Sequence, residues 1–243
     1  PTVSAALLAF NASTGQPIAL MSAGHLTAMR TGAICGVATK YLAREDARIL
    51  AVIGCGTQAR TQVQAVSKAR KLEAVRVYCR SRQRAERFAE EMERLTGVPV
   101  AAASSAEEAV RAADIISTAT TSSEPVLKRQ WIKDGAHINA IGSYTPDARE
   151  LDTETVVDSK IVVDKLEAAL EEAGDILIPI REGKLSPDKI YAELGEIIVG
   201  RKPGRASENE ITLFKTVGIA VQDTAAAYVA LRNYLRAFSE TKP

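Results

Sequence analysis

Short apolar runs, each long enough for one buried strand, alternate with helical stretches through the middle of the chain. The predicted strands lie at 48–54, 75–78, 98–100, 114–117, 136–140 and 160–163. Helical stretches are predicted at 58–67, 83–95 and 106–111. Strands that alternate with helices in this way form a parallel sheet covered on both faces. The pattern therefore predicts one doubly wound α/β domain, over residues 46–164.

The chain before this domain has a different pattern. Apolar runs at 5–10 and 17–21 flank a cluster of turn formers at 11–15, which predicts a β-hairpin. From 29 to 41 every fourth residue is apolar, as one face of a helix requires. We therefore expect a helix over residues 27–42, with Arg30 and Thr31 in its first turn.

After Asp164 the strand pattern stops, and an acidic stretch at 167–172 leads into loops that end near residue 205. The residues from Ser207 to Glu210 have the spacing of a capping box, in which serine and glutamate side chains satisfy the free backbone amides of a helix start. We therefore expect a last helix that begins here and is broken at Gly218.

Composition and charge narrow the class of protein. The 243 residues are 46% hydrophobic and carry a net charge of +1, which is typical of a globular protein and gives no field to attract nucleic acid or membranes. No apolar run is long enough to span a bilayer. The three cysteines are scattered, which favours a reducing compartment and predicts neither disulfides nor a metal site. We expect a cytoplasmic protein without bound metal.

The clearest motif for chemistry is a glycine-rich turn after the first strand of the α/β domain. Gly54 allows the tight turn, Gly56 lets the backbone approach a pyrophosphate, and Thr57 and Gln58 open the following helix, whose amides point at the anion. A plain strand-to-helix turn is the alternative. The βαβ context favours a dinucleotide site.

The end of the second strand bears on the choice of cofactor. An acidic residue there would bind the ribose of NAD, but Cys79 holds this place and Arg80, Ser81 and Arg82 follow. Cations at a helix start oppose the helix dipole unless an anion offsets them. We therefore predict NADP(H), with NAD(H) as the second choice and a solvated basic helix start as the alternative explanation.

Small polar residues follow two later strands. Thr118, Ala119 and Thr120 end one strand and Gly142 ends the next, and both places lie at the carboxyl edge, where cofactors bind in such sheets. We expect them to contact ribose and nicotinamide. The two histidines, His25 and His137, are interpreted as structural because neither has catalytic partners nearby in the sequence.

At this point the chain resembles the ornithine cyclodeaminase and mu-crystallin family. The matching segments are 27–33, 54–60, 113–120, 149–152, 204–205 and 213–223. The resemblance implies a Rossmann-type domain at 46–164, inserted into a second α+β domain formed by 1–45 and 165–243, which binds substrate and forms a homodimer. It also implies that the family's N-terminal segment, with the lysine and arginine that hold the substrate carboxylate, would precede Pro1.

The resemblance further implies roles for single residues. Arg30 and Thr31 would contact the cofactor, Arg30 would also border the substrate, and Thr216, Val217 and Gly218 would lie by the nicotinamide, the last two next to the substrate. Cyclodeaminases have a catalytic aspartate after the Gly142 strand end, where this chain has Tyr144. A tyrosine, with an ordinary pKa of ~10, is a poor substitute for that carboxylate. No catalytic residue is assigned.

Three functions stay open. The leading hypothesis is an NAD(P)H-dependent oxidoreductase acting on the C–N bond of a small amino or imino acid, as cyclic ketimine reductases and alanine dehydrogenases do. The first alternative is an ornithine cyclodeaminase, a lyase that recycles NAD and releases ammonia. The second is a binding protein similar to mu-crystallin, which holds NADPH and a small ligand without turnover.

Overall fold

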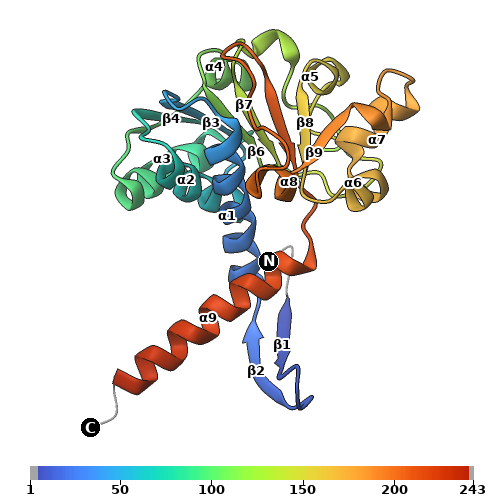
Figure 1. The fold of residues 1–243 in the computed structure, drawn as a ribbon. Coiled ribbons are helices and arrows are strands. Elements are labelled where there is room, and N and C mark those ends of the chain that lie inside the picture. The colour runs from blue at the N-terminus through green and yellow to red at the C-terminus, as the bar shows by residue number, and fades with distance from the viewer. Residues whose placement is uncertain (1–4, 241–243) are drawn as a thin grey trace.

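The computed structural model describes residues 5–240, and a single parallel sheet forms its centre (Figure 1). The strand order is β5-β4-β3-β6-β7-β10-β8-β9, and every pairing is parallel. The strands are β3 (Ile49–Ile53), β4 (Ala74–Tyr78), β5 (Val100–Ala102), β6 (Ile115–Thr118), β7 (His137–Ala140), β8 (Lys160–Val163), β9 (Ile190–Glu193) and β10 (Thr212–Lys215). The first five follow the order of a Rossmann fold. The predicted doubly wound sheet is confirmed.

Helices cover both faces of this sheet. On one face lie α1 (Gly24–Leu42), α2 (Thr57–Ala69), α3 (Arg82–Thr96) and α8 (Leu194–Ile198). On the other lie α4 (Ala106–Val110), α5 (Thr153–Val157), α6 (Leu166–Glu172) and α7 (Gly174–Arg181). In β3 the side chains alternate: Leu50 and Val52 face α2 and α3, whereas Ala51 and Ile53 face the opposite core. A strand buried on both faces needs the continuous apolar run that the sequence shows.

The prediction for residues 207–210 is wrong. They form a turn before β10, and the last helix, α9 (Ala220–Glu240), begins after Gly218. The carboxylate of Glu210 accepts the backbone N–H of Ala206 at 2.8 Å, so it does not cap a helix. Residues 212–215 pair with β7 and β8 and are fully buried, and this burial overrides a four-residue local pattern.

The expectation that strands end at Asp164 is also wrong, because β9 and β10 belong to the same sheet. Residues 165–240 thus complete the central sheet and also supply α9. The division at residues 45 and 164 stays a prediction, but the second boundary does not coincide with an edge of the sheet.

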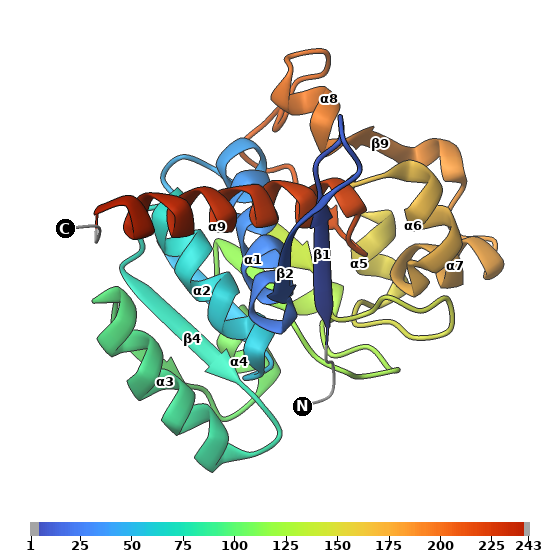
Figure 2. The ribbon, with the colours of Figure 1, turned by 90° about the horizontal axis from the view of Figure 1, so that it is seen from below.

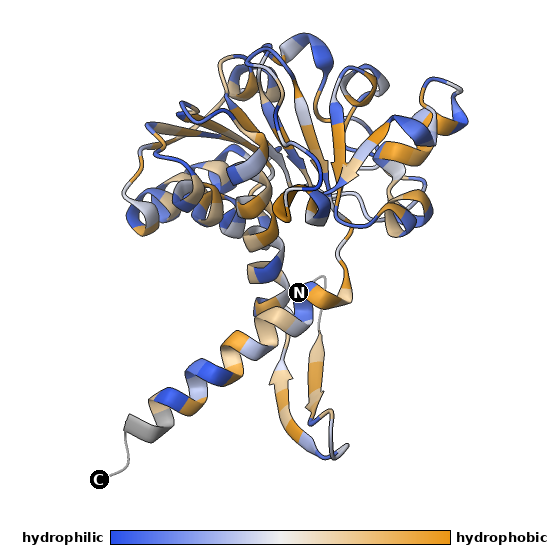
Figure 3. Cartoon of the chain, in the orientation of Figure 1, coloured by the Kyte–Doolittle hydropathy of each residue, from blue (hydrophilic) through white to orange (hydrophobic). Residues whose placement is uncertain are grey.

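Two elements extend away from the body of the molecule. The hairpin of β1 (Ala6–Phe10) and β2 (Pro17–Ser22) is antiparallel, as predicted, and α9 crosses beneath α1 and α2 (Figure 1, Figure 2). Both carry exposed apolar side chains. Parts of both ribbons are orange in Figure 3, which marks hydrophobic residues. Examples are Leu8 (52% exposed) and Leu20 (76%) on the hairpin, and Val221 (64%) and Tyr228 (65%) on α9.

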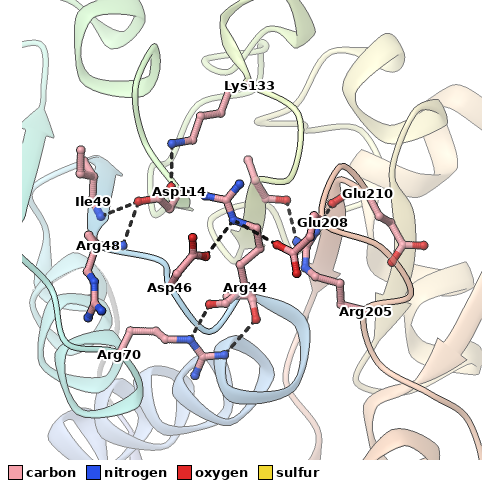
Figure 4. A network of polar contacts seen from close by, with 12 residues as sticks. Arg44, Asp46, Arg48, Ile49, Arg70, Asp114, Lys133, Arg205, Glu208 and Glu210 are labelled. Carbon is pink, nitrogen blue, oxygen red and sulfur yellow. Dashed lines mark hydrogen bonds and ion pairs between the residues drawn. The ribbon is translucent and has the colours of Figure 1, made fainter.

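A polar network fixes the helices to the amino edge of the sheet (Figure 4). Asp114, just before β6, accepts the backbone N–H groups of Arg48 and Ile49, both at 2.8 Å, and ion pairs with Arg44 and Lys133. Burial raises the pKa of Asp114, but the hydrogen bonds from Lys133 and from the two backbone amides outweigh burial and lower it below its ordinary value. This network lies at the edge opposite to the predicted cofactor site.

Candidate active site

The glycine loop, residues 54–56, joins β3 to α2. Gly54 has φ +111°, and a Cβ there would overlap the carbonyl oxygen of Ala119 at the end of β6. At Gly56 a Cβ would meet nothing within 4 Å. Gly54 is therefore required by the neighbouring strand end, whereas Gly56 leaves open backbone at the start of α2, a place where helix amides can bind a phosphate.

Arg60 holds this loop from beneath. Its Nη1 donates to the carbonyls of Cys55 and Gly56, both at 3.1 Å, and its Nη2 lies 2.7 Å from Glu91. The guanidinium also lies 5.4 Å from the ring centre of Phe88. The hydrogen bond with Glu91 is the main reason that the pKa of Arg60 is raised. Because its guanidinium contacts the loop carbonyls, Glu91 and the Phe88 ring, Arg60 stabilises the conformation of the glycine loop.

The first turn of α2 is open to a ligand. Thr57 is exposed, and the Oε1 atom of Gln58 is buried without a hydrogen-bond partner in the described part of the chain. A buried acceptor without a partner costs free energy unless a ligand or water reaches it. Both residues were predicted to bind the cofactor, and their surroundings fit that role.

The end of β4 carries the basic residues that the sequence singled out. The Ser81 hydroxyl caps α3 by accepting the backbone N–H of Arg84, and Arg82 ion pairs with Glu86 at 2.7 Å. Within residues 5–240 the side chains of Arg80 and Arg84 form no ion pair, and both are exposed. Cys79 contacts Cys55 of the glycine loop, and burial is the main cause that raises the pKa of Cys55 to about 11.

The ends of β6 and β7 are joined by one buried carboxylate, that of Glu150. Its Oε2 accepts the Thr118 hydroxyl and the Gly142 N–H, both at 2.7 Å. Its Oε1 accepts the Thr120 N–H at 2.6 Å and the Thr120 hydroxyl at 2.7 Å. Burial, followed by the charge of Asp175, raises the pKa of Glu150. Ala119, Thr120 and Gly142 are partly exposed, whereas Thr118 is fully buried.

A buried ion pair lies behind these strand ends. Lys215, the last residue of β10, donates to Asp175 of α7 at 2.8 Å and to the carbonyl of Ser143 at 2.5 Å. Asp175 also accepts the backbone N–H groups of Glu150 and Leu151. The side chains of Lys215 and Asp175 are both 0% exposed. The end of β10, α7 and the segment from Ser143 to Leu151 are thereby held together at the carboxyl edge of the sheet.

Residues after β10 meet the start of α1. Asp164 accepts the Thr216 hydroxyl at 2.5 Å and the Gly218 N–H at 2.8 Å. A Cβ on Gly218, where φ is +92°, would lie 2.5 Å from Nη1 of Arg30. The Arg30 guanidinium is itself held by Gln222 at 2.9 Å and by Asp223 at 3.2 Å. Two residues predicted from opposite ends of the chain, Arg30 and Gly218, are thus in contact.

The remaining predicted residues vary in accessibility. Thr31 is buried and donates its hydroxyl to the Thr27 carbonyl, and Val217 is partly buried against the core. Tyr144 is 57% exposed. His137 is buried at the amino edge between Thr212 and Asn139, as its structural interpretation required, and burial lowers its pKa to about 3.

Sequence reasoning missed the residues that support the site: Arg60, Glu150, Asp175 and Lys215. One signal was available, because Lys215 is the single charged residue within 211–217, and a lysine in such a segment implies a buried partner. Glu150 gave no comparable signal, since it lies among other polar residues, and Asp175, which directly precedes the apolar run 176–180, was not singled out.

Comparison with known proteins places this geometry in context. Residues 1–236 match the family model described as the ornithine cyclodeaminase/mu-crystallin family. The Delta(1)-pyrroline-2-carboxylate reductase of Bacillus cereus is 44% identical over 227 residues, which are 93% of this chain and 70% of that protein. The ketimine reductase mu-crystallin of Rattus norvegicus is 40% identical over 93% of this chain and 68% of its own length.

Solved structures of other proteins share the fold of this chain. The Thermococcus litoralis Delta(1)-pyrroline-2-carboxylate reductase in complex with NADH and L-proline has a TM-score of 0.96 and 49% identity, over 98% of this chain and 73% of that one. An archaeal alanine dehydrogenase dimer with bound NAD has a TM-score of 0.92 and 40% identity, over 98% and 73%. Within residues 5–240, no helix has the length and apolar character to cross a membrane.

Proposed function

The chain belongs to the ornithine cyclodeaminase/mu-crystallin family, and we propose that it is an NAD(P)H-dependent oxidoreductase acting on the C–N bond of a small amino or imino acid. The observation that carries this proposal is the open backbone at Gly56, beside strand ends bearing Thr120 and Gly142. The relatives that reduce pyrroline-2-carboxylate and other ketimines support the same reaction class. A cyclic ketimine carboxylate is the substrate we favour.

The residues present fit a dinucleotide. The glycine loop and the first turn of α2 would hold the pyrophosphate, with Thr57 and Gln58 nearest to it. Ala119, Thr120 and Gly142 would flank the nicotinamide, and Thr216, which is buried with its hydroxyl on Asp164, would lie next to it without a side-chain contact. The bound cofactor supplies the hydride, and the protein supplies orientation and charge.

Arg30 is the residue we propose for the substrate carboxylate. Its hydrogen bond to Gln222 uses Nη1 and leaves Nη2 as a further donor, and the absence of a side chain at Gly218 leaves room for the guanidinium, whose side chain is 15% exposed. A carboxylate binds guanidinium through parallel hydrogen bonds. Val217 would contribute an apolar contact to the ring of a cyclic substrate. Tyr144 is exposed in the loop after β7, and we assign it no proton transfer.

The test is oxidation of NADPH or NADH by the purified protein with pyrroline-2-carboxylate, other cyclic ketimine carboxylates, or pyruvate plus ammonia. Turnover of one of these supports the proposal. Ammonia release from ornithine without added reduced cofactor would instead identify a cyclodeaminase. Tight nucleotide binding without any turnover would favour a binding protein.

We also propose a preference for NADPH. No carboxylate follows β4 to repel a 2'-phosphate, and Arg80 and Arg84 are exposed and unpaired within residues 5–240. Arg80→Ser and Arg84→Ser should each weaken NADPH binding by about fivefold, since an exposed ion pair contributes ~1 kcal/mol, and leave NADH binding unchanged. Arg94→Ser, at the far end of α3, removes the same charge and is the control. Equal losses for both cofactors would contradict the preference.

A homodimer is the third part of the proposal. The two-stranded hairpin and α9 both carry exposed apolar residues that nothing in the described chain covers. Such uncovered apolar surfaces are typical of interfaces between protein chains. The archaeal alanine dehydrogenase is a dimer. Light scattering should give a dimer mass, and Leu20→Glu should shift it to a monomer. A monomeric wild type would refute this part.

We also propose a cytoplasmic location. Free thiols at all three cysteines support it, because a reducing compartment keeps thiols unpaired.

A further inference from the structure

Glu150 is a buried carboxylate that no cation neutralises within the described part of the chain. It is 0% exposed, and it lies in the segment between β7 and α5 rather than in a strand or helix. Its two oxygens accept four hydrogen bonds, all from neutral donors. No Lys or Arg of residues 5–240 forms an ion pair with it. A buried carboxylate without a cation costs free energy, so the arrangement calls for a reason.

The donors all belong to the two strand ends that flank the proposed nicotinamide site. Thr118 and Thr120 come from the end of β6, and Gly142 comes from the end of β7. Each oxygen of Glu150 takes one backbone N–H, that of Thr120 or that of Gly142. The carboxylate therefore sets the distance between these two loops.

The backbone of Glu150 is fixed in turn. Its N–H donates to Asp175 at 2.7 Å, and Asp175 is paired with Lys215, which donates to the carbonyl of Ser143. Gly142 and Ser143 are consecutive, so one is held by the Glu150 carboxylate and the other by Lys215. The loop after β7 is thus held at two successive residues by buried charged groups.

We propose that Glu150 is a positioning residue that sets the two loops against the nicotinamide half of the cofactor. This inference rests on the proposed function. Thr118 has its hydroxyl on Glu150 and is fully buried, so it would act through Glu150 and not by side-chain contact with the cofactor. The partly exposed residues Ala119, Thr120 and Gly142 are then presented to the cofactor by a rigid support.

Asp114 offers a matched control at the opposite edge of the sheet. It is 6% exposed and also accepts two backbone N–H groups, those of Arg48 and Ile49. It lies before β6, whereas the loop that Glu150 holds lies after β6. Asp114→Asn should therefore lower stability without moving the cofactor loops.

The test compares Glu150→Gln with Asp114→Asn in the full chain. Glutamine has the size of glutamate, but its amide NH2 must face the N–H of either Thr120 or Gly142, so one hydrogen bond becomes a donor–donor contact. We expect Glu150→Gln to weaken the binding of NADPH and of NADH by about tenfold or more. Binding is measured by the fluorescence of the reduced nucleotide. Hydrogen exchange at residues 118–122 and 142–144 should rise. Asp114→Asn should leave both readouts within about twofold of wild type.

Each result has a single meaning. If the wild type binds nucleotide and Glu150→Gln binds it equally well, the positioning role is refuted while the proposed function stands. If the wild type binds neither NADPH nor NADH, the proposed function itself fails. If Glu150→Gln does not fold, Thr118→Val removes one donor and should weaken binding about threefold, with the same rise in exchange at 142–144; unchanged binding and exchange in that variant would refute the proposal.

Discussion

Replacing Lys215 by methionine should destabilise the protein more than any single change at an exposed ion pair. The Nζ of Lys215 lies 2.8 Å from Asp175, and both side chains are 0% exposed. Methionine fills most of the lysine volume, so the main effect is an uncompensated carboxylate at Asp175. Removing one partner of a buried pair costs about 3–5 kcal/mol. For a chain of this size, that lowers the melting temperature by roughly 6–20 °C.

The assay is thermal and urea unfolding of wild type, Lys215→Met and the double variant Asp175→Asn/Lys215→Met. Asparagine still accepts the N–H groups of Glu150 and Leu151 but carries no charge, so the double variant should recover about 1–3 kcal/mol. Lys133→Met is the control, because its ion pair with Asp114 is partly exposed and Arg44 remains to replace it. A loss below about 1 kcal/mol in Lys215→Met, or no recovery in the double variant, would refute the reasoning.

Three further predictions concern other parts of the molecule. Because the pKa of His137 is lowered from 6.5 to about 3, the unfolded chain binds more protons between these values, and stability should fall as the pH drops through this window by up to ~1.4 kcal/mol per unit; urea midpoints should depend less on pH in His137→Gln, and equal slopes would count against the assignment. Gly54→Ala should abolish nucleotide binding and lower stability by more than ~2 kcal/mol, whereas Gly15→Ala, with φ +70° but open space around it, should cost ~1 kcal/mol by the same unfolding assay. Arg60→Met releases the glycine-loop carbonyls and should weaken NADPH binding by about fivefold in a fluorescence titration; unchanged affinity would show that the loop needs no such support.

The local elements could be predicted wherever burial and periodicity agree. The strand at 49–53 is a continuous apolar run, and the structure has it. The strand at 212–215 could not be found in this way, since Lys215 interrupts its apolar pattern and the turn before it has the spacing of a helix cap. Only its place between β7 and β8 makes it a strand, and that is a property of the sheet.

The candidate site divides in a similar way. Residues proposed to meet a ligand through their backbone, such as Gly54 and Gly56, are constrained locally and could be predicted from the strand–turn–helix context. Glu150 and Asp175 act through hydrogen bonds to segments that are distant in sequence, among them Thr118, which lies 32 residues before Glu150. These hydrogen-bond partners are brought together by the order of the strands in the sheet. A local pattern of residues in the sequence therefore cannot predict them.

The position of β10 has a consequence for how the chain acquires its shape. During synthesis, β7 and β8 emerge long before the strand that lies between them, because Thr212 pairs with both His137 and Lys160. Until residue 215 has left the ribosome, β7 and β8 each have one edge whose backbone N–H and C=O groups lack a partner strand. The nascent chain therefore passes through a stage prone to mispairing, and a fragment cut at residue 164 would be left in that stage permanently.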